Sequence, residues 1–534
     1  MLFNSYEFVL LFLPVAVFWY YVIGPARRNM ALYWLIFVSL FFYAWWSPLN
    51  VFLVAPSIVI NYALIRFLLK LGERRPLLSR AAFWCGIAFN LCFLGYFKYS
   101  NFFVTLSNDV TGSAYIFNEI ILPLGISFIT FQKIALLVDV RAERVSDVNL
   151  RDYALFVLFF PQLVAGPIVH YRELMPQFRD GDGSLRAGNM AVGLTLFFTG
   201  LFKKVLLADP IAALIAGTWL QAGTGGHPAL LQAWAAALGY MLQLYFDFSG
   251  YSDMAIGASR LFGIRLPFNF NSPLKATSVI DYWSRWHVTL TRFLTAYIFS
   301  PLTLALTRKR AARGLSTVGG RRTTPTAFLA LLAYPTMVTM LLAGVWHGAG
   351  YQFLVFGALH GVALVMNHAW RLWRPRGLPG GAGATVLSWA LTFLFVVGAE
   401  VFFRASSVGA GVSILRGMAG VNGVTVPMAI ADRLAGLSHA LPIRGVFESG
   451  ADFVQLWSWI AAGLLIVLGL PNTLELLSVY DPALGFKVRP AEHTRLLRWL
   501  AWSPSPAWAL GLSALSVLAL LSLGRVSDFL YWHF

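Results

Sequence analysis

The protein has 534 residues, of which 58% are hydrophobic and 12% are charged. A soluble domain has about 45–50% apolar and about 25% charged residues, so this composition excludes a soluble protein and predicts an integral membrane protein. The net charge of +17 does not require a nucleic-acid partner, because the basic residues cluster in short loops between apolar segments, as the positive-inside rule describes.

Apolar stretches of roughly 17–25 residues recur along nearly the whole chain, and each is about long enough to cross a hydrocarbon core of about 30 Å as a helix. We expect about eleven to thirteen membrane helices, because a spanning helix satisfies its own backbone hydrogen-bonding groups. The first stretch has no basic leader and no small-residue cleavage site, so we expect a retained helix rather than a signal peptide. The stretches are 8–23, 31–46, 51–69, 81–97, 116–138, 192–211, 327–346, 351–366, 386–403, 456–470 and 508–523.

Two segments carry signals that interrupt helices. The region that begins at Arg151 is apolar over 153–178 but contains Pro161, Gly166 and Pro167 in its middle, so we expect a re-entrant or broken helix there. Serines, glycine and two aspartates interrupt the apolar pattern over 245–255, and we expect a second break at this point. The following residues, 270–299, are rich in aromatic and charged side chains, which favours amphipathic helices at the membrane interface or under the core.

The chain is expected to form one membrane domain over 1–534, because it contains no tandem repeat and no low-complexity linker. Within it we expect N-terminal helices over 1–150, a motif-bearing catalytic core over 151–370 and C-terminal helices over 371–534. A loop insertion is expected near 407–451.

Two histidines in strongly apolar sequence, His287 and His347, are the leading candidates for chemistry. Ionisable side chains are costly at membrane depth, so they are functional candidates by default. The sequence has no metal-ligand spacing, no nucleophile elbow and no phosphate-binding loop. A histidine is well suited to act as general base for a hydroxyl, which indicates transfer between two bound substrates. The structural alternatives are a backbone hydrogen bond for His347 and an aromatic interface anchor for His287.

Seven ordered sequence blocks carry a family resemblance. They are PLGISFITFQ (123–132), FFPQLVAGPIVHYRELMPQF (159–178), GLFKKVLLAD (200–209), YFDFSGYSDMAIGASRLFGIRLPFNFNSP (245–273), DYWSRWHVTLTRFL (281–294), LLAGVWHGAGYQFLVFGALHG (341–361) and FFRA (402–405). With these blocks the chain resembles the membrane-bound O-acyltransferases, and among them the bacterial alginate O-acetyltransferase branch.

The resemblance implies an all-α polytopic fold, with a ring of about 11–13 transmembrane helices and re-entrant or broken helices around a central tunnel. It implies that His347 is the catalytic histidine and that His287 is a second polar residue in the same tunnel. An acetyl group would come from a cytoplasmic thioester, acetyl-CoA, with no tightly bound cofactor and no metal. The acceptor would be a hydroxyl, for O-acetylation of an extracytoplasmic polysaccharide such as alginate or another exopolysaccharide.

The resemblance also implies a location and partners. We expect a multi-pass protein of the bacterial inner membrane, in contact with membrane lipids and an acyl-CoA donor. The expected protein partners are a periplasmic SGNH-type acetyltransferase and polysaccharide-synthesis proteins. The chain departs from the branch at Thr295 and Ala296, where Arg-Asp is usual, and in the longer basic loop 308–322. These departures leave the natural acceptor open.

Six further residues are candidates for lining the tunnel: Asp247, Asp253, Gln132, Trp346, Trp286 and Arg285. As structural alternatives, the aspartates would pair with nearby arginines or cap broken helices, and the glutamine would hydrogen-bond between helices. We expect Lys203 and Lys204 to snorkel to the cytoplasmic interface. His360 follows His347 by thirteen residues, about 20 Å along a helix, so we expect a structural role for it unless the chain folds back.

Two alternative functions stay open from the sequence. A transporter or flippase for a polysaccharide precursor or lipid would also have broken helices and polar groups near the membrane midplane. The chain lacks the internal repeat that many such transporters have. An O-acyltransferase could instead act on peptidoglycan, cellulose, a lipid or a protein.

Overall fold

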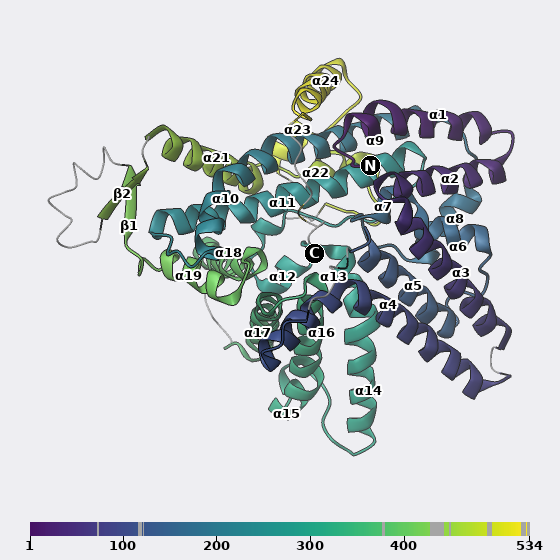
Figure 1. The fold of residues 1–534 in the computed structure, drawn as a ribbon, viewed down its shortest axis with the longest axis horizontal. Coiled ribbons are helices and arrows are strands. Elements are labelled where there is room, and N and C mark those ends of the chain that lie inside the picture. Colours follow the sequence, from purple (N-terminus) through teal and green to yellow (C-terminus); the bar gives the residue numbers. More distant parts are fainter. Residues whose placement is uncertain are drawn as a thin grey trace. The chain divides into compact units, whose positions relative to one another are not determined.

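The computed structural model describes residues 1–71, 74–115, 120, 122–375, 380–427, 443–447, 450–488, 494–524 and 530. Helices account for nearly all of the regular structure in this part of the chain (Figure 1), which confirms the predicted all-α polytopic fold. The chain divides into two compact units. The first comprises Met1–Phe202, Ser249–Asn269 and Thr473–His533, and the second comprises Lys203–Phe248 and Phe270–Asn472.

The first unit contains the N-terminal helices and the C-terminal helices. Its elements are η1 (Glu7–Phe12), α1 (Leu13–Ile23), α2 (Arg28–Trp46), α3 (Pro48–Leu71), α4 (Pro76–Thr111), α5 (Ile126–Arg141), α6 (Leu150–Leu158), α7 (Phe160–Leu163), α8 (Tyr171–Asp180), α9 (Ala187–Phe202), α22 (Thr473–Leu476), η8 (Ser478–Tyr480), α23 (Arg495–Leu500) and α24 (Pro506–Leu521). The last part of α11 (Leu230–Leu261) also belongs to this unit.

The second unit contains the first part of α11 and both candidate histidines. Its other elements are η2 (Lys203–Ala208), α10 (Asp209–Gly223), η3 (Pro273–Lys275), α12 (Val279–Trp283), α13 (Val288–Leu294), η4 (Thr295–Phe299), α14 (Ser300–Ala311), η5 (Gly320–Arg322), α15 (Pro325–Phe328), η6 (Leu329–Ala333), α16 (Tyr334–His347), α17 (Tyr351–Trp373), α18 (Ala382–Arg404), α19 (Val408–Met418), β1 (Val424–Pro427), β2 (Ile443–Phe447) and α21 (Gly450–Gly469). The two strands pair in parallel, with Val424 opposite Ile443.

Eight helical segments of the described chain are long and apolar enough to cross a membrane. This number is below the expected eleven to thirteen, partly because three other apolar helices have only 10–17 residues. One long segment was not expected, since α13, η4 and α14 form a continuous helix where amphipathic helices were predicted. The eight are Pro48–Leu71, Pro76–Thr111, Ala187–Gly223, Val288–Ala311, Pro325–His347, Tyr351–Trp373, Ala382–Arg404 and Ala451–Gly469.

The predicted break in 151–178 is confirmed. Helix α6 ends at Leu158, the four-residue helix α7 follows with Pro161 in its first turn, and α8 begins at Tyr171. A proline lacks the backbone N–H that a helix interior requires, so it can start α7 but cannot continue α6 through this point. The intervening residues are buried, as expected for irregular backbone at membrane depth.

The predicted break over 245–255 is wrong, because α11 runs without interruption from Leu230 to Leu261. Two of its buried polar side chains bind other elements laterally: Asp247 forms an ion pair with Lys204, and the Ser252 hydroxyl accepts a hydrogen bond from the Asn269 side-chain amide at 3.2 Å. Small residues let α11 approach α9 closely, since a Cβ on Gly257 would lie 2.6 Å from the Gly193 carbonyl oxygen. The polar and small residues that suggested a break therefore serve lateral contacts of a continuous helix.

The predicted loop insertion near 407–451 is partly wrong. Residues Val408–Met418 form α19, whose start is capped by the Ser407 hydroxyl accepting a hydrogen bond from the Ala410 N–H. Strands β1 and β2 follow in the same stretch. The remaining residues of this prediction, 428–442 and 448–449, lie outside the described part of the chain.

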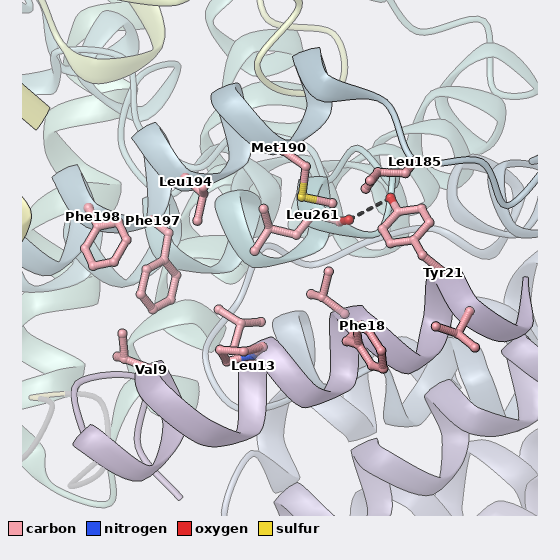
Figure 2. A pocket seen from close by; sticks show the side chains of 13 residues that line it. Val9, Leu13, Phe18, Tyr21, Leu185, Met190, Leu194, Phe197, Phe198 and Leu261 are labelled. Atoms are coloured by element: carbon pink, nitrogen blue, oxygen red, sulfur yellow. Dashed lines mark hydrogen bonds between the residues drawn. The ribbon is translucent and has the colours of Figure 1, made fainter. Parts of the chain in front are cut away.

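An apolar pocket of about 600 Å³ opens in the first unit between α1, α9 and the end of α11 (Figure 2). Leu13 of α1 faces Met190 and Leu194 of α9 across it, and Tyr21 is the one polar residue in its lining. The Tyr21 hydroxyl donates a hydrogen bond to the Leu261 carbonyl oxygen at 2.7 Å. The pocket thus has no acid or base that could carry chemistry.

A buried carboxylate, Asp152, fastens the broken segment. It accepts hydrogen bonds from Arg151 at 2.7 and 2.9 Å and from Arg179 of α8 at 2.7 Å. Asn149 caps α6 by accepting a hydrogen bond from the Asp152 N–H. Burial by itself raises the pKa of Asp152, but the hydrogen bonds and charges of the two arginines outweigh it and hold this pKa below its usual value. The ionised carboxylate therefore ties α6 to α8.

We expect Asp152→Asn to lower the free energy of unfolding by about 1.5–3 kcal/mol at pH 7, the range for hydrogen bonds to a charged group. Because the folded-state pKa is lowered, this stabilisation is present above the unfolded pKa of ~3.9 and is lost as the pH falls below it. Unfolding in detergent as a function of pH checks both effects. Asp180→Asn, at an exposed carboxylate of α8, is the control. A pH-independent difference between Asp152→Asn and wild type would contradict the prediction.

Candidate active site

His347 is the last residue of α16 and is buried. Residues 348–350 turn the chain into α17, which packs back along α16 (Figure 1). The His347 ring lies 4.9 Å from the Phe403 ring of α18 and 6.0 Å from the Phe356 ring of α17, centroid to centroid. Gly348 is required here for space, because a side chain at this position would collide with the Phe353 ring. Three helices therefore position this imidazole.

His287 is fully buried between α12 and α13. Its backbone has φ 41° and ψ 53°, a left-handed conformation that costs a residue other than glycine about 1–3 kcal/mol. Its ring meets Phe248 edge-on at 4.8 Å. A strained backbone persists only where the surrounding structure enforces it, and such positions cluster at functional sites.

Aromatic contacts join the two histidines into one buried cluster within the second unit. The Trp346 ring lies 4.8 Å from His347 and 6.2 Å from His287. The contacts close into a circuit that contains, in order, His287, Phe248, Phe270, Trp286, Tyr282, His360, Phe356, His347 and Trp346. We call this set the aromatic cluster. Trp346 and Trp286, both candidates from the sequence, belong to it.

His360 also belongs to the aromatic cluster, although the sequence favoured a structural role for it. Its ring lies 4.6 Å from Phe356, the same ring that contacts His347. The 20 Å separation expected for an uninterrupted helix does not apply, because the chain folds back between α16 and α17. The Nδ1 atom of His360 accepts a hydrogen bond from Trp283 Nε1–H at 3.2 Å.

The remaining polar candidates fall outside the circuit. Arg285 pairs with Asp281, one turn earlier, at 3.0 Å. Asp247 forms an ion pair with Lys204, whose ammonium also lies 2.9 Å from Asp209. The pairing expected for Asp247 is therefore present, with a lysine in place of an arginine. The expected snorkelling of Lys204 is wrong, because the side chain is only 2% exposed.

Two candidates, Asp253 and Gln132, belong to the first unit and are buried there on α11 and α5. Within the described part of the chain, no group of three or more His, Cys, Asp or Glu side chains could hold a metal ion.

Sequence reasoning missed Glu400, a buried carboxyl of α18. Its Oε1 atom accepts a hydrogen bond from the Tyr282 hydroxyl at 3.0 Å, so it adjoins the aromatic cluster. A signal was available, because Glu400 is the lone acidic residue of the apolar stretch 386–403 and acidic residues at membrane depth are functional candidates.

Known proteins resemble this chain over most of its length. A model of the membrane-bound O-acyltransferase family matches residues 82–319. The peptidoglycan O-acetyltransferase of Helicobacter pylori is 39% identical over 463 residues, covering 80% of this chain and 81% of that protein. A probable alginate O-acetylase of Pseudomonas aeruginosa is 38% identical over 418 residues, covering 76% and 72%. The chain belongs to the membrane-bound O-acyltransferase family.

This membership confirms the resemblance and identifies a multi-pass membrane enzyme with acyltransferase activity. It decides against the transporter alternative. A more distant relative, the teichoic acid D-alanyltransferase of Bacillus subtilis, is 28% identical over 277 residues, covering 51% of this chain and 66% of that protein.

We expect Lys204→Met to destabilise the acyltransferase by about 3–5 kcal/mol, because it leaves the buried Asp247 carboxylate without its cation. Adding Asp247→Asn should restore part of this loss. Unfolding in detergent measures both variants, with Lys309→Met at an exposed lysine of α14 as the control. Equal effects of Lys309→Met and Lys204→Met would show that the ion pairs of Lys204 are not the cause.

Proposed function

We propose that this acyltransferase moves an acetyl group from acetyl-CoA to a hydroxyl, for O-acetylation of an extracytoplasmic polysaccharide. The observation that carries the proposal is that His347 and His287, 60 positions apart in the sequence, meet in one buried aromatic cluster. The peptidoglycan and alginate relatives support an acetyl donor and a sugar acceptor.

In the proposed reaction, His347 acts as general base. Its neutral imidazole takes the proton from the acceptor hydroxyl while the hydroxyl oxygen attacks the thioester carbonyl carbon. The carbon–sulfur bond then breaks, and the CoA sulfur leaves with the proton that His347 returns. A positioned base contributes about 10²–10⁴-fold, and alignment of two bound substrates supplies the larger part of the acceleration. No tightly bound cofactor takes part.

His287 is proposed to assist as a second polar group. Its fixed, strained backbone holds the imidazole at a defined place beside Trp346, which contacts both histidines. The surrounding aromatic rings exclude water, which protects the thioester from hydrolysis. Among the candidates of the second unit, Trp346, Trp286, Arg285 and Asp247 are proposed as substrate-tunnel residues, with Asp247 and Arg285 acting through their ion pairs.

The proposed acceptor is a sugar hydroxyl of alginate or another exopolysaccharide, with peptidoglycan as the second candidate. The peptidoglycan and alginate relatives are almost equally similar to the chain, at 39% and 38% identity. The two candidates share one chemistry, a hydroxyl on a polysaccharide outside the cytoplasm. We place the enzyme in the bacterial inner membrane, where a periplasmic SGNH-type acetyltransferase and polysaccharide-synthesis proteins would receive or use the acetyl group.

We expect His347→Ala to reduce acetyl transfer by at least about 10²-fold, because the reaction loses its base. His287→Ala should reduce it less. Release of free CoA from acetyl-CoA, by enzyme in lipid nanodiscs supplied with alginate oligomers or peptidoglycan fragments, measures both variants and compares the acceptors. Unchanged unfolding temperatures would show that the variants are folded. Turnover by His347→Ala at the wild-type rate would refute the assignment.

Direct transfer predicts that no acetyl group becomes covalently attached to the enzyme. After incubation with radiolabelled acetyl-CoA in the absence of acceptor, denatured wild-type protein should carry no label above that of His347→Ala. Label that survives denaturation of the wild type alone would replace direct transfer with an acyl-enzyme mechanism.

A further inference from the structure

Helix α12 is held by hydrogen bonds from two neighbouring aromatic residues to buried titratable side chains. The Tyr282 hydroxyl donates to Glu400 Oε1 of α18 at 3.0 Å. The Trp283 indole Nε1–H donates to His360 Nδ1 of α17 at 3.2 Å. Glu400 is 2% exposed and His360 is fully buried. The long apolar helices α18 and α17 thus each supply one acceptor to the five-residue helix α12, one for Tyr282 and one for Trp283.

Both polar groups depend on α12 for their hydrogen bonding. Within the described part of the chain, Glu400 Oε2 and His360 Nε2 have no hydrogen-bond partner. A buried polar group without any partner costs several kcal/mol, so the single bond that each group makes to α12 is important for its burial. Displacement of α12 would break both bonds at once. The pair of bonds therefore fixes the position of α12 against α17 and α18.

The bond to His360 also fixes the tautomer of this imidazole. Because Nδ1 accepts the Trp283 hydrogen, the proton of the neutral ring must lie on Nε2. The Tyr282 ring stacks on the His360 ring at 6.1 Å with an angle of 15° between the planes. Tyr282 therefore contacts both Glu400 and His360.

The position of α12 determines the position of His287. The backbone N–H of Trp286 donates a hydrogen bond to the Tyr282 carbonyl oxygen at 2.8 Å. The rings of these two residues stack with their centroids 5.7 Å apart and an angle of 13° between their planes. Trp286 directly precedes His287 in the chain. On the other side, the Thr291 hydroxyl of α13 donates to the Trp283 carbonyl oxygen at 3.2 Å. The left-handed His287 thus lies between two attachments to the residues that Glu400 and His360 hold.

We infer that Glu400 and His360 are positioning residues that hold α12, and through it His287, in the geometry required for acyl transfer. The inference rests on the proposed function of His287. Neither residue needs to touch the substrate for this role. Their effect passes through Tyr282 and Trp283 to the turn that carries the imidazole.

The test compares apolar with conservative substitutions at each position. Glu400→Leu and His360→Leu remove the hydrogen-bond acceptor, whereas Glu400→Gln and His360→Asn keep an oxygen that can accept the bond. We expect the leucine variants to lower kcat about 10- to 100-fold, because a displacement of about 1 Å at a catalytic group can cost about 100-fold. The KM for acetyl-CoA should change by less than about twofold. The glutamine and asparagine variants should keep most of the wild-type kcat.

Tyr282→Phe adds an independent arm, because it removes the donor of the Glu400 bond. It should lower kcat as Glu400→Leu does, and the double variant should be no slower than either single variant, since both changes break one interaction. The inference would be overturned if the double variant Tyr282→Phe, Glu400→Leu lost kcat by the product of the two single losses. It would also be overturned by leucine variants with wild-type kcat, or by glutamine and asparagine variants as slow as the leucine variants.

Asn90→Leu is the matched control. Asn90 and Asn61 are buried on α4 and α3 of the first unit and exchange two side-chain hydrogen bonds, at 2.6 and 3.2 Å. Its replacement also removes a buried polar contact between two membrane helices, but should change the amount of folded protein and leave kcat of the folded fraction unchanged. Failure of the proposed function is distinguishable, because it would appear as an inactive wild type or an active His347→Ala.

Discussion

The apolar surroundings of the membrane-spanning helices oblige buried polar side chains to find partners within the protein. Lys204 meets this requirement by pairing with Asp209 and Asp247. Asn61 and Asn90 meet it by exchanging hydrogen bonds between α3 and α4. The same requirement explains why α11 continues through its polar stretch. Because Lys204 pairs with the Asp247 side chain laterally, this carboxylate can be buried within an uninterrupted helix.

This constraint also shapes the candidate active site. His287 and His347 are buried among aromatic rings. Such an environment suits a reaction in which a thioester must meet a sugar hydroxyl before it meets water. The strained backbone of His287 fits the same purpose, because the contacts that enforce it also limit the movement of the imidazole.

Some features could be predicted because their cause is local. Pro161 stops a helix wherever it stands, so the break in 151–178 was visible in the sequence. The cost of placing a histidine in apolar sequence made His287 and His347 stand out for a similar reason. Other features depended on distant residues. The lateral partners of α11 and the fold-back that brings His360 to Phe356 could not be read from neighbouring residues.

The sequence by itself determined that the protein is a helical membrane protein, carried the blocks by which it resembles the acyltransferase family, and singled out two histidines as candidates for chemistry. Composition and the cost of burial suffice for the membrane helices and for the choice of candidates, because they act on each residue where it stands. Only the tertiary structure decided that these histidines share one aromatic cluster and that Glu400 and His360 support α12 beside them. The choice of partner for a buried polar group depends on proximity in space, which the order of residues along the chain does not specify.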